Sequence, residues 1–75
     1  MLNKLKDLIN LVLEDEGQEI IEVLRKEDSL TADLGFDSLA LAVLTVHIEE
    51  SFGIDVFEDG IVDTVEEIIE KLTGD

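Results

Sequence analysis

The sequence contains no cysteine and no proline, and it has few basic residues. Without cysteine the chain can form neither a disulfide nor a thiolate metal site, so any thiol chemistry needs a sulfur atom from outside the sequence. Without proline, helices can run uninterrupted, because proline removes a backbone donor and clashes with the preceding turn. Five bases against 20 acids give a formal net charge of −15. Nucleic acid and anionic lipid are therefore not expected as partners, because binding to either depends on lysine and arginine.

Long apolar segments are also missing. The longest apolar run covers residues 39–44 and is far too short to span a bilayer. The first seven residues carry Lys4, Lys6 and Asp7, where a signal peptide would be largely apolar. We therefore expect a cytoplasmic protein without membrane insertion.

What the chain does contain is enough apolar surface for a small folded domain. Hydrophobic residues make up 45% of its 75 residues, too many for a disordered acidic tail. This length predicts one domain, residues 1–75, with a modest core, and we expect a monomer. The acidic surface should attract proteins that carry basic patches and speed the encounter with them.

Apolar residues at helical spacing predict an amphipathic helix over about residues 2–15 and a second helix over 38–52. Asp37 is a suitable N-cap for the second helix, because its side chain can accept a hydrogen bond from an unpaired backbone N–H. Thr64 and Glu67 fit the capping box of a last helix.

The connections between these helices differ in length. Residues 18–37 are predicted to form a long structured loop that Leu24, Leu30 and Leu34 anchor, and loops of this length in small domains are often functional. Residues 54–62 predict a short irregular element with at most one helical turn. The fold class is therefore all-α: a small bundle of three main helices plus a short third helix or turn, with a long first loop.

The second predicted helix carries two apolar stripes. One stripe consists of Leu41, Leu44, Ile48 and Phe52, and the other of Leu39, Val43 and Val46, closing with Glu50. A small domain can cover only one stripe fully. We expect the stripe with the larger side chains to face the core and the other to face a partner or ligand.

One motif closes the long loop and opens the second helix. It reads Asp33-Leu34-Gly35-Phe36-Asp37-Ser38-Leu39, and Glu49-Glu50-Ser51-Phe52 follows near the end of the helix. With this layout the chain resembles the acyl carrier protein family over nearly its whole length. The resemblance implies an acyl-carrier-like bundle in which a phosphopantetheinyl transferase attaches 4′-phosphopantetheine, derived from coenzyme A, to Ser38. It also implies a carrier rather than an enzyme, which holds acyl intermediates as thioesters.

Physical chemistry favours Ser38 independently of the resemblance. A helix N-terminus offers unpaired N–H groups and the positive end of the helix dipole, so a phosphodiester there is stabilised. Gly35 lets the chain turn sharply just before the helix. A second Asp-Ser-Leu, at residues 28–30, has neither a preceding glycine nor a following helix. We interpret Ser29 as a loop serine that bonds local backbone, with Leu30 buried.

The resemblance also suggests which residues meet partners. Asp37 would serve the transferase as well as capping the helix. Glu49 and Glu50 are either a solvated face or contacts for basic partner enzymes, and the stripe of Leu39, Val43 and Val46 would complete the docking face. An acyl-loading ligase or acyltransferase and other biosynthetic enzymes are the implied partners.

This chain departs from the family pattern at several positions. Fatty-acid-type members often have acids where this chain has Ala40 and Val43, and they usually have a proline where it has Phe57. The stretch 57–65 also looks about two residues shorter than in those members. These departures suggest a specialised free-standing carrier with a more apolar docking face. The cargo stays open between a fatty acyl chain, a polyketide unit, an amino acid and a sugar-pathway acyl group, so an aminoacyl or peptidyl carrier is an alternative.

A function of another class is a calcium-binding protein, because residues 55–66 resemble an EF-hand loop. Acids occupy loop positions 1, 5, 9 and 12 and glycine position 6, but position 3 is Phe57, which offers no oxygen. Ordinary surface acids around a glycine turn explain the same pattern, so we expect no metal site. Catalysis is not expected either, because His47, the single histidine, lies about 13 Å from Ser38 along one helix.

Overall fold

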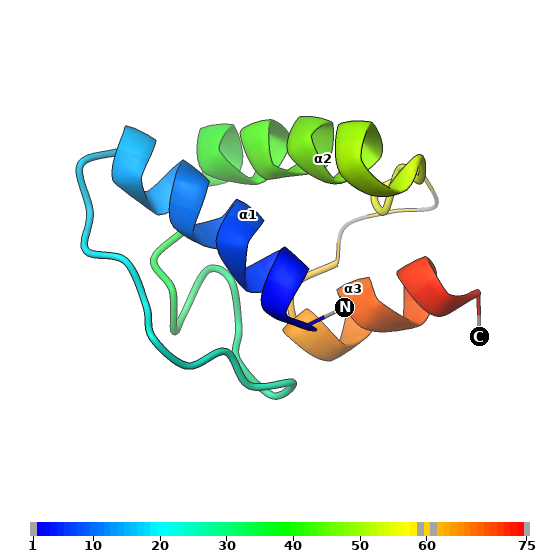
Figure 1. The fold of residues 1–75 in the computed structure, drawn as a ribbon, viewed down its shortest axis with the longest axis horizontal. Coiled ribbons are helices and arrows are strands. Elements are labelled where there is room, and N and C mark those ends of the chain that lie inside the picture. The colour runs from blue at the N-terminus through cyan, green and yellow to red at the C-terminus, as the bar shows by residue number, and fades with distance from the viewer. Residues whose placement is uncertain (1, 59, 61, 75) are drawn as a thin grey trace.

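The computed structural model describes residues 2–58, 60 and 62–74 and forms three helices over them (Figure 1). Helix α1 covers Leu2–Asp15, α2 covers Ser38–Phe52 and α3 covers Val65–Thr73. The predicted all-α class is confirmed. Of the two forms predicted for the segment between α2 and α3, the structure has the turn, at residues 56–58. Within the described part of the chain, no helix has the length and apolarity needed to cross a bilayer.

Local capping explains where α2 and α3 begin and end. The Asp37 side chain accepts a hydrogen bond from the Ala40 N–H at 2.8 Å, which starts α2. At the other end Gly53 adopts φ 74°, a left-handed conformation that costs glycine little, and its N–H donates to the Glu49 carbonyl at 2.8 Å. Thr64 and Glu67 form the predicted capping box of α3. These predictions from the sequence are confirmed.

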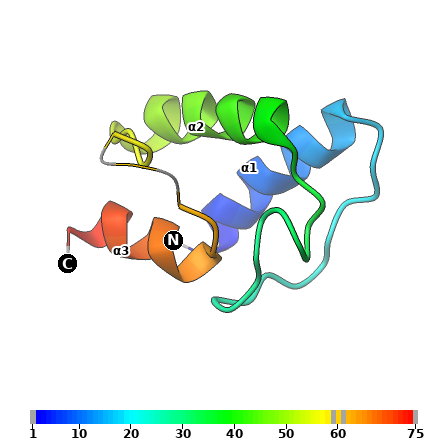
Figure 2. The same ribbon diagram turned by 180° about the vertical axis from the view of Figure 1, so that it is seen from behind.

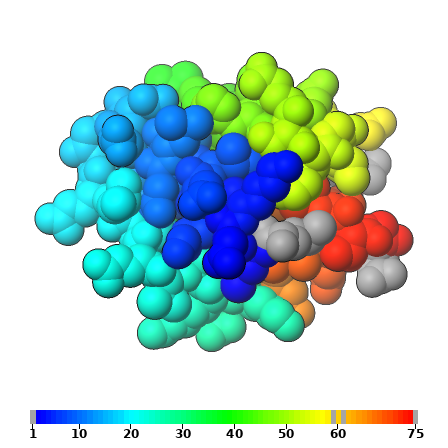
Figure 3. All heavy atoms as spheres, in the orientation of Figure 1, coloured from blue at the N-terminus to red at the C-terminus, as the bar shows by residue number. Residues whose placement is uncertain are grey.

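The core forms where all three helices and both connections meet. Its buried members are Leu5, Ile9, Val12, Leu13, Leu24, Leu30, Phe36, Ala40, Leu44, Ile48, Val56, Val62, Val65, Ile68 and Leu72. Helices α1 and α2 run in roughly opposite directions, so the end of α1 and the start of α2 lie at the same end of the molecule (Figures 1 and 2). In the space-filling view the long loop covers the side of α1 away from α2 (Figure 3). The start of α2 is therefore built on a packed base of helix and loop.

The two faces of α2 largely follow the prediction. Leu44 and Ile48 are fully buried, whereas Leu39 and Val46 are 66% and 54% exposed. Leu41 and Phe52, predicted as core, are partly buried and pack against it.

Two residues of α2 differ from the predicted stripes. Val43 is partly buried and packs against the core, because it projects only about 100° away from the neighbouring Leu44. Ala40 is buried, and it lies one turn before Leu44 on the same line of the helix. The core line of α2 is thus Ala40, Leu44 and Ile48, with Leu41 and Val43 at its margins.

The long loop is anchored as predicted and also at positions that the sequence did not indicate. Leu24 and Leu30 are buried and Leu34 packs against the core. Phe36, which was not predicted as core, is buried next to them. The Asn10 side chain both accepts from the Ile21 N–H at 2.8 Å and donates to the Ile21 carbonyl at 2.9 Å, which ties the loop to α1. The loop is therefore a fixed part of the fold.

Candidate functional site

Ser38 is the first residue of α2 and its side chain is exposed. Asp37 before it has extended backbone and caps the helix through the Ala40 N–H. Because a helix leaves its first N–H groups without partners inside the helix, the N–H groups of Ser38 and Leu39 remain available. The site thus combines an accessible hydroxyl with donors and the positive end of a helix dipole, which suits a phosphate ester on that hydroxyl.

The turn before Ser38 holds the serine on a rigid support. Gly35 has φ 75°, and a side chain there would also meet the Gln18 Oε1 atom at 3.3 Å. The Phe36 N–H donates to the Leu30 carbonyl at 2.8 Å, and the Phe36 ring is buried. Two residues before Ser38 the chain is therefore fixed both by a hydrogen bond and by core packing.

An apolar pocket of about 240 Å³ opens beside Ser38. Leu41, Ala42 and Phe57 line it together with the serine. Phe57 comes from the turn between α2 and α3, where its N–H donates to Asp55 Oδ1 at 2.9 Å. Because most of its lining is hydrocarbon, the pocket offers an apolar chain tethered at Ser38 a place out of water. The chemistry of the site residues fits a phosphopantetheine group at this position.

The residues predicted to meet partners lie along α2. Leu39, Val46, Glu49 and Glu50 are exposed, whereas Val43 is only partly exposed. No acidic residue stands in α2 before Glu49, although the chain has 20 acids. Apart from the exposed N-cap Asp37, the part of α2 that follows Ser38 therefore carries no negative side chain until the last turn of the helix.

The second Asp-Ser-Leu occupies a different environment. Ser29 Oγ accepts from the Ala32 N–H at 3.1 Å and Leu30 is fully buried, so the predicted role of Ser29 as a loop serine is confirmed. The sequence did not indicate that Ser29 Oγ also donates to Asp63 Oδ2, at 2.6 Å. This bond, followed by the one from the Thr31 side chain, lowers the pKa of Asp63. In the sequence, the only sign of the bond between Ser29 and Asp63 was the acid at position 63, and that acid also fitted the possible calcium-binding loop.

The loop at 55–66 does not gather ligands among the residues that the structure describes. No group of three or more potential metal-binding side chains occurs there, and Asp59 lies outside the described residues. The Asp63 carboxylate accepts hydrogen bonds from Ser29 and Thr31. His47 is half-buried in α2, about 13 Å of helix rise from Ser38, which is beyond the reach of a base for that hydroxyl.

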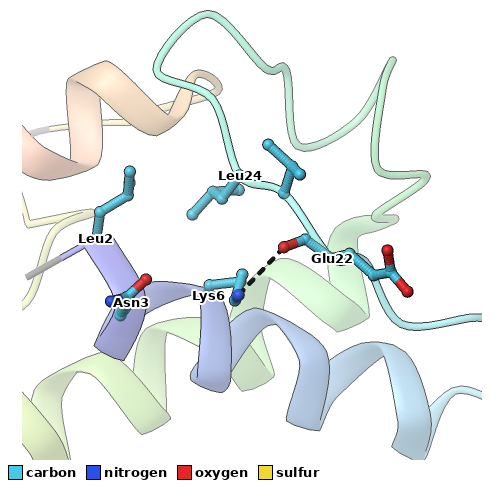
Figure 4. Close-up of a pocket in the computed structure, with 6 residues that line it drawn as sticks. Leu2, Asn3, Lys6, Glu22 and Leu24 are labelled. Carbon is cyan, nitrogen blue, oxygen red and sulfur yellow. Dashed lines mark hydrogen bonds between the residues drawn. The ribbon is translucent and has the colours of Figure 1, made fainter.

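A further pocket, of about 180 Å³, lies at the start of α1 (Figure 4). It is lined by Leu2, Asn3, Lys6, Glu22, Val23 and Leu24. The Lys6 ammonium donates to the Glu22 carbonyl at 3.1 Å, so it holds the loop against the helix. This pocket contains no hydroxyl nucleophile and does not include Ser38.

Comparison with known proteins gives a family for most of the chain. Residues 3–72 match the family model described as "Phosphopantetheine attachment site". An acyl carrier protein of Desulforapulum autotrophicum is 48% identical over 44 residues, which are 59% of this chain and 56% of that protein. The match thus spans little more than half of the relative's length. No solved structure gave a significant match.

Proposed function

Because the chain belongs to the family described as "Phosphopantetheine attachment site" and is similar to an acyl carrier protein, we propose that it carries acyl groups as thioesters on 4′-phosphopantetheine attached to Ser38. Members of this family are carriers rather than enzymes. The observation that carries the assignment to Ser38 is its place: an exposed hydroxyl at the first residue of α2, on a turn fixed by Phe36.

Attachment requires Ser38 to act as a nucleophile toward coenzyme A in the active site of a transferase. Its Oγ atom forms a bond to the phosphorus that bears the pantetheine. The bond from that phosphorus to the adenosine bisphosphate breaks, and the hydroxyl proton leaves to a base of the transferase. The product is a phosphodiester next to the Ser38 and Leu39 N–H groups, where the helix dipole favours its negative charge.

Once attached, the group supplies the thiol that this cysteine-free chain lacks. The chain's own residues then act as a support. Asp37 keeps the start of α2 in place, and the pocket of Leu41, Ala42 and Phe57 shelters apolar parts of the arm or of its cargo. Whether the cargo is an acyl chain or an aminoacyl group decides between an acyl carrier and an aminoacyl or peptidyl carrier.

The partners we propose are a phosphopantetheinyl transferase and biosynthetic enzymes that load, extend or unload the cargo, among them a ligase or an acyltransferase. Their docking face comprises Asp37, Leu39, Val43, Val46, Glu49 and Glu50. The exposure of Leu39, which is next to Ser38, and of Val46, farther along α2, supports an apolar contact. We further propose that residues 1–75 act as a single monomeric domain in the cytoplasm.

The test is to incubate the apo protein with coenzyme A and a phosphopantetheinyl transferase and to map the mass gain by proteolysis and mass spectrometry. We expect one phosphopantetheine on Ser38. Ser38→Ala should abolish the gain. After complete reaction, Ser29→Ala, the matched change in the other Asp-Ser-Leu, should still carry the group on Ser38, because this test reads the site of attachment and not its rate. No gain in the wild-type chain, or a gain that survives Ser38→Ala, would reject the assignment.

A further inference from the structure

The long loop and the entry to α3 are joined by a cluster of side chains that we call the 63 clasp: Ser29, Thr31 and Asp63. Asp63 Oδ2 accepts from Ser29 Oγ at 2.6 Å, and Oδ1 accepts from Thr31 Oγ1 at 2.9 Å and from the Thr31 N–H at 3.3 Å. One carboxylate thus receives three donors from a segment more than 30 residues earlier in the chain. Hydrogen bonds to a charged acceptor are the stronger kind, so the clasp is a firm link between the two segments.

Main-chain bonds continue from the clasp toward the attachment serine. The Leu30 N–H donates to the Asp63 carbonyl at 2.8 Å, and the Phe36 N–H donates to the Leu30 carbonyl at 2.8 Å. Ser29 and Thr64 also form an isolated antiparallel bridge. A continuous path of contacts therefore runs from Asp63 through the turn around Leu30 to Phe36, two residues before Ser38.

The same turn is closed from within by Ser29. Its carbonyl accepts from the N–H groups of Asp33 and Leu34 at 2.9 and 3.1 Å, and its N–H donates to Asp33 Oδ2 at 2.7 Å. Ser29 therefore organises the turn. The Asp63 carboxylate fixes the Ser29–Thr31 part of that turn to the entry of α3, beside the main-chain bond from the Leu30 N–H and that from the Val65 N–H to the Asp28 carbonyl. The second Asp-Ser-Leu thus supports the first.

We propose that Asp63 is a positioning residue for arm attachment: its carboxylate, through Ser29 and Thr31, holds the turn that presents Ser38 to the transferase. This inference rests on the proposed function. Asp63 does not touch Ser38, and its side chain is not part of the buried core, so its removal leaves the helices and their packing in place. What changes is the freedom of residues 29–36 and hence the geometry of the hydroxyl.

The test compares initial rates of arm attachment on the full-length apo protein, at varied protein concentration, for the wild type, Asp63→Ala and Asp63→Asn. Thr64→Ala is the matched control. The Thr64 side chain lies at the same entry to α3, but among the described residues its hydroxyl bonds Glu67 and not the turn, so its loss weakens the junction without releasing the turn. The folded fraction of each variant is measured by circular dichroism under assay conditions.

We expect Asp63→Ala to lower kcat/KM for arm attachment by about 10- to 100-fold, because small displacements of a reacting group cost this much. The loss should appear in kcat. Partial unfolding alone would instead raise the apparent KM by the reciprocal of the folded fraction. The kcat/KM of Asp63→Asn should lie between those of the wild type and Asp63→Ala, because the asparagine amide oxygen still accepts a hydrogen bond from one hydroxyl. After correction for the folded fraction, the kcat/KM of Thr64→Ala should match that of the wild type. Exchange of the Phe36 amide hydrogen should accelerate in Asp63→Ala more than in Thr64→Ala.

Each outcome decides the matter. The positioning role is overturned if Asp63→Ala is loaded as fast as the wild type, or if Thr64→Ala shows the same loss of kcat/KM as Asp63→Ala. Either result leaves the proposed function intact. A wild-type chain that is not loaded overturns the proposed function and the positioning role together. Should Asp63→Ala fail to fold, the kcat and Phe36 exchange of Asp63→Asn decide between the same outcomes.

Discussion

Replacing one leucine by alanine at two places on α2 tests which face of this helix holds the domain together. Leu44 is fully buried and Leu39 is 66% exposed, and both lie within the same 15-residue helix. The change in helix propensity is the same at both positions, so it cancels in the comparison. The remaining difference in stability therefore reports burial.

The size of the effect follows from the groups removed. Leucine to alanine deletes three carbon groups, worth about 2.4 kcal/mol at about 0.8 kcal/mol each when fully buried. The cavity left at Leu44 raises the cost to about 2–5 kcal/mol. At Leu39 only about one third of the transfer term applies, about 0.8 kcal/mol, and no cavity forms. The losses in the free energy of unfolding should thus differ by about 1.2–4.2 kcal/mol, at least about sevenfold in the folding equilibrium.

Urea titration followed by far-ultraviolet circular dichroism measures both free energies of unfolding. Domains of this length have about 4–11 kcal/mol in total, so Leu44→Ala should shift the midpoint strongly. Leu39→Ala should stay near the wild type. Equal midpoints, or a larger loss in Leu39→Ala, would show that the faces of α2 are assigned the wrong way round.

Three further outcomes are expected. Val46→Glu, at a 54% exposed position, should change stability by less than about 1 kcal/mol yet impair cargo loading by the ligase or acyltransferase that serves this carrier; unchanged loading kinetics would remove Val46 from the docking face. Hydrogen bonds to Asp63 from Ser29 and Thr31 lower the pKa of Asp63 in the folded state, so the wild type should be more stable than Asp63→Asn at neutral pH and lose this advantage as the pH falls through that lowered pKa. Urea titrations at a series of pH values measure this difference in stability, and a difference that grows on acidification contradicts the prediction. Finally, a net charge of −15 repels itself within a small domain, so the midpoint of thermal unfolding should rise from low to high sodium chloride, and a flat or falling response would speak against strong self-repulsion.

The sequence alone was sufficient for the helices and for their ends. Asp37 caps α2, Thr64 and Glu67 cap α3, and α2 ends at residue 52, all as predicted. These features could be predicted because helical periodicity and capping involve residues within about four positions of one another. The motif around Ser38 belongs to the same class, because its glycine, aspartate and serine are neighbours in the chain.

Which residues at the edge of the core are buried depended on how the helices and loops pack against one another. Val43 and Leu39 share a stripe in the sequence, but the core reaches Val43 and leaves Leu39 exposed. Phe36, Val56 and Val62 lie in segments without periodicity, so nothing local marked them as core. The rotation of α2 against its neighbours and the path of the loop decided these positions.

The partnership of Ser29 with Asp63 is the clearest case of a feature that only the tertiary structure decided. Each residue had a reasonable local interpretation, Ser29 as a loop serine and Asp63 as a surface acid or a calcium-loop position. Their 2.6 Å hydrogen bond joins residues 34 positions apart. It exists because the core brings the long loop against the entry to α3, and no periodicity or cap in one sequence encodes such a pairing.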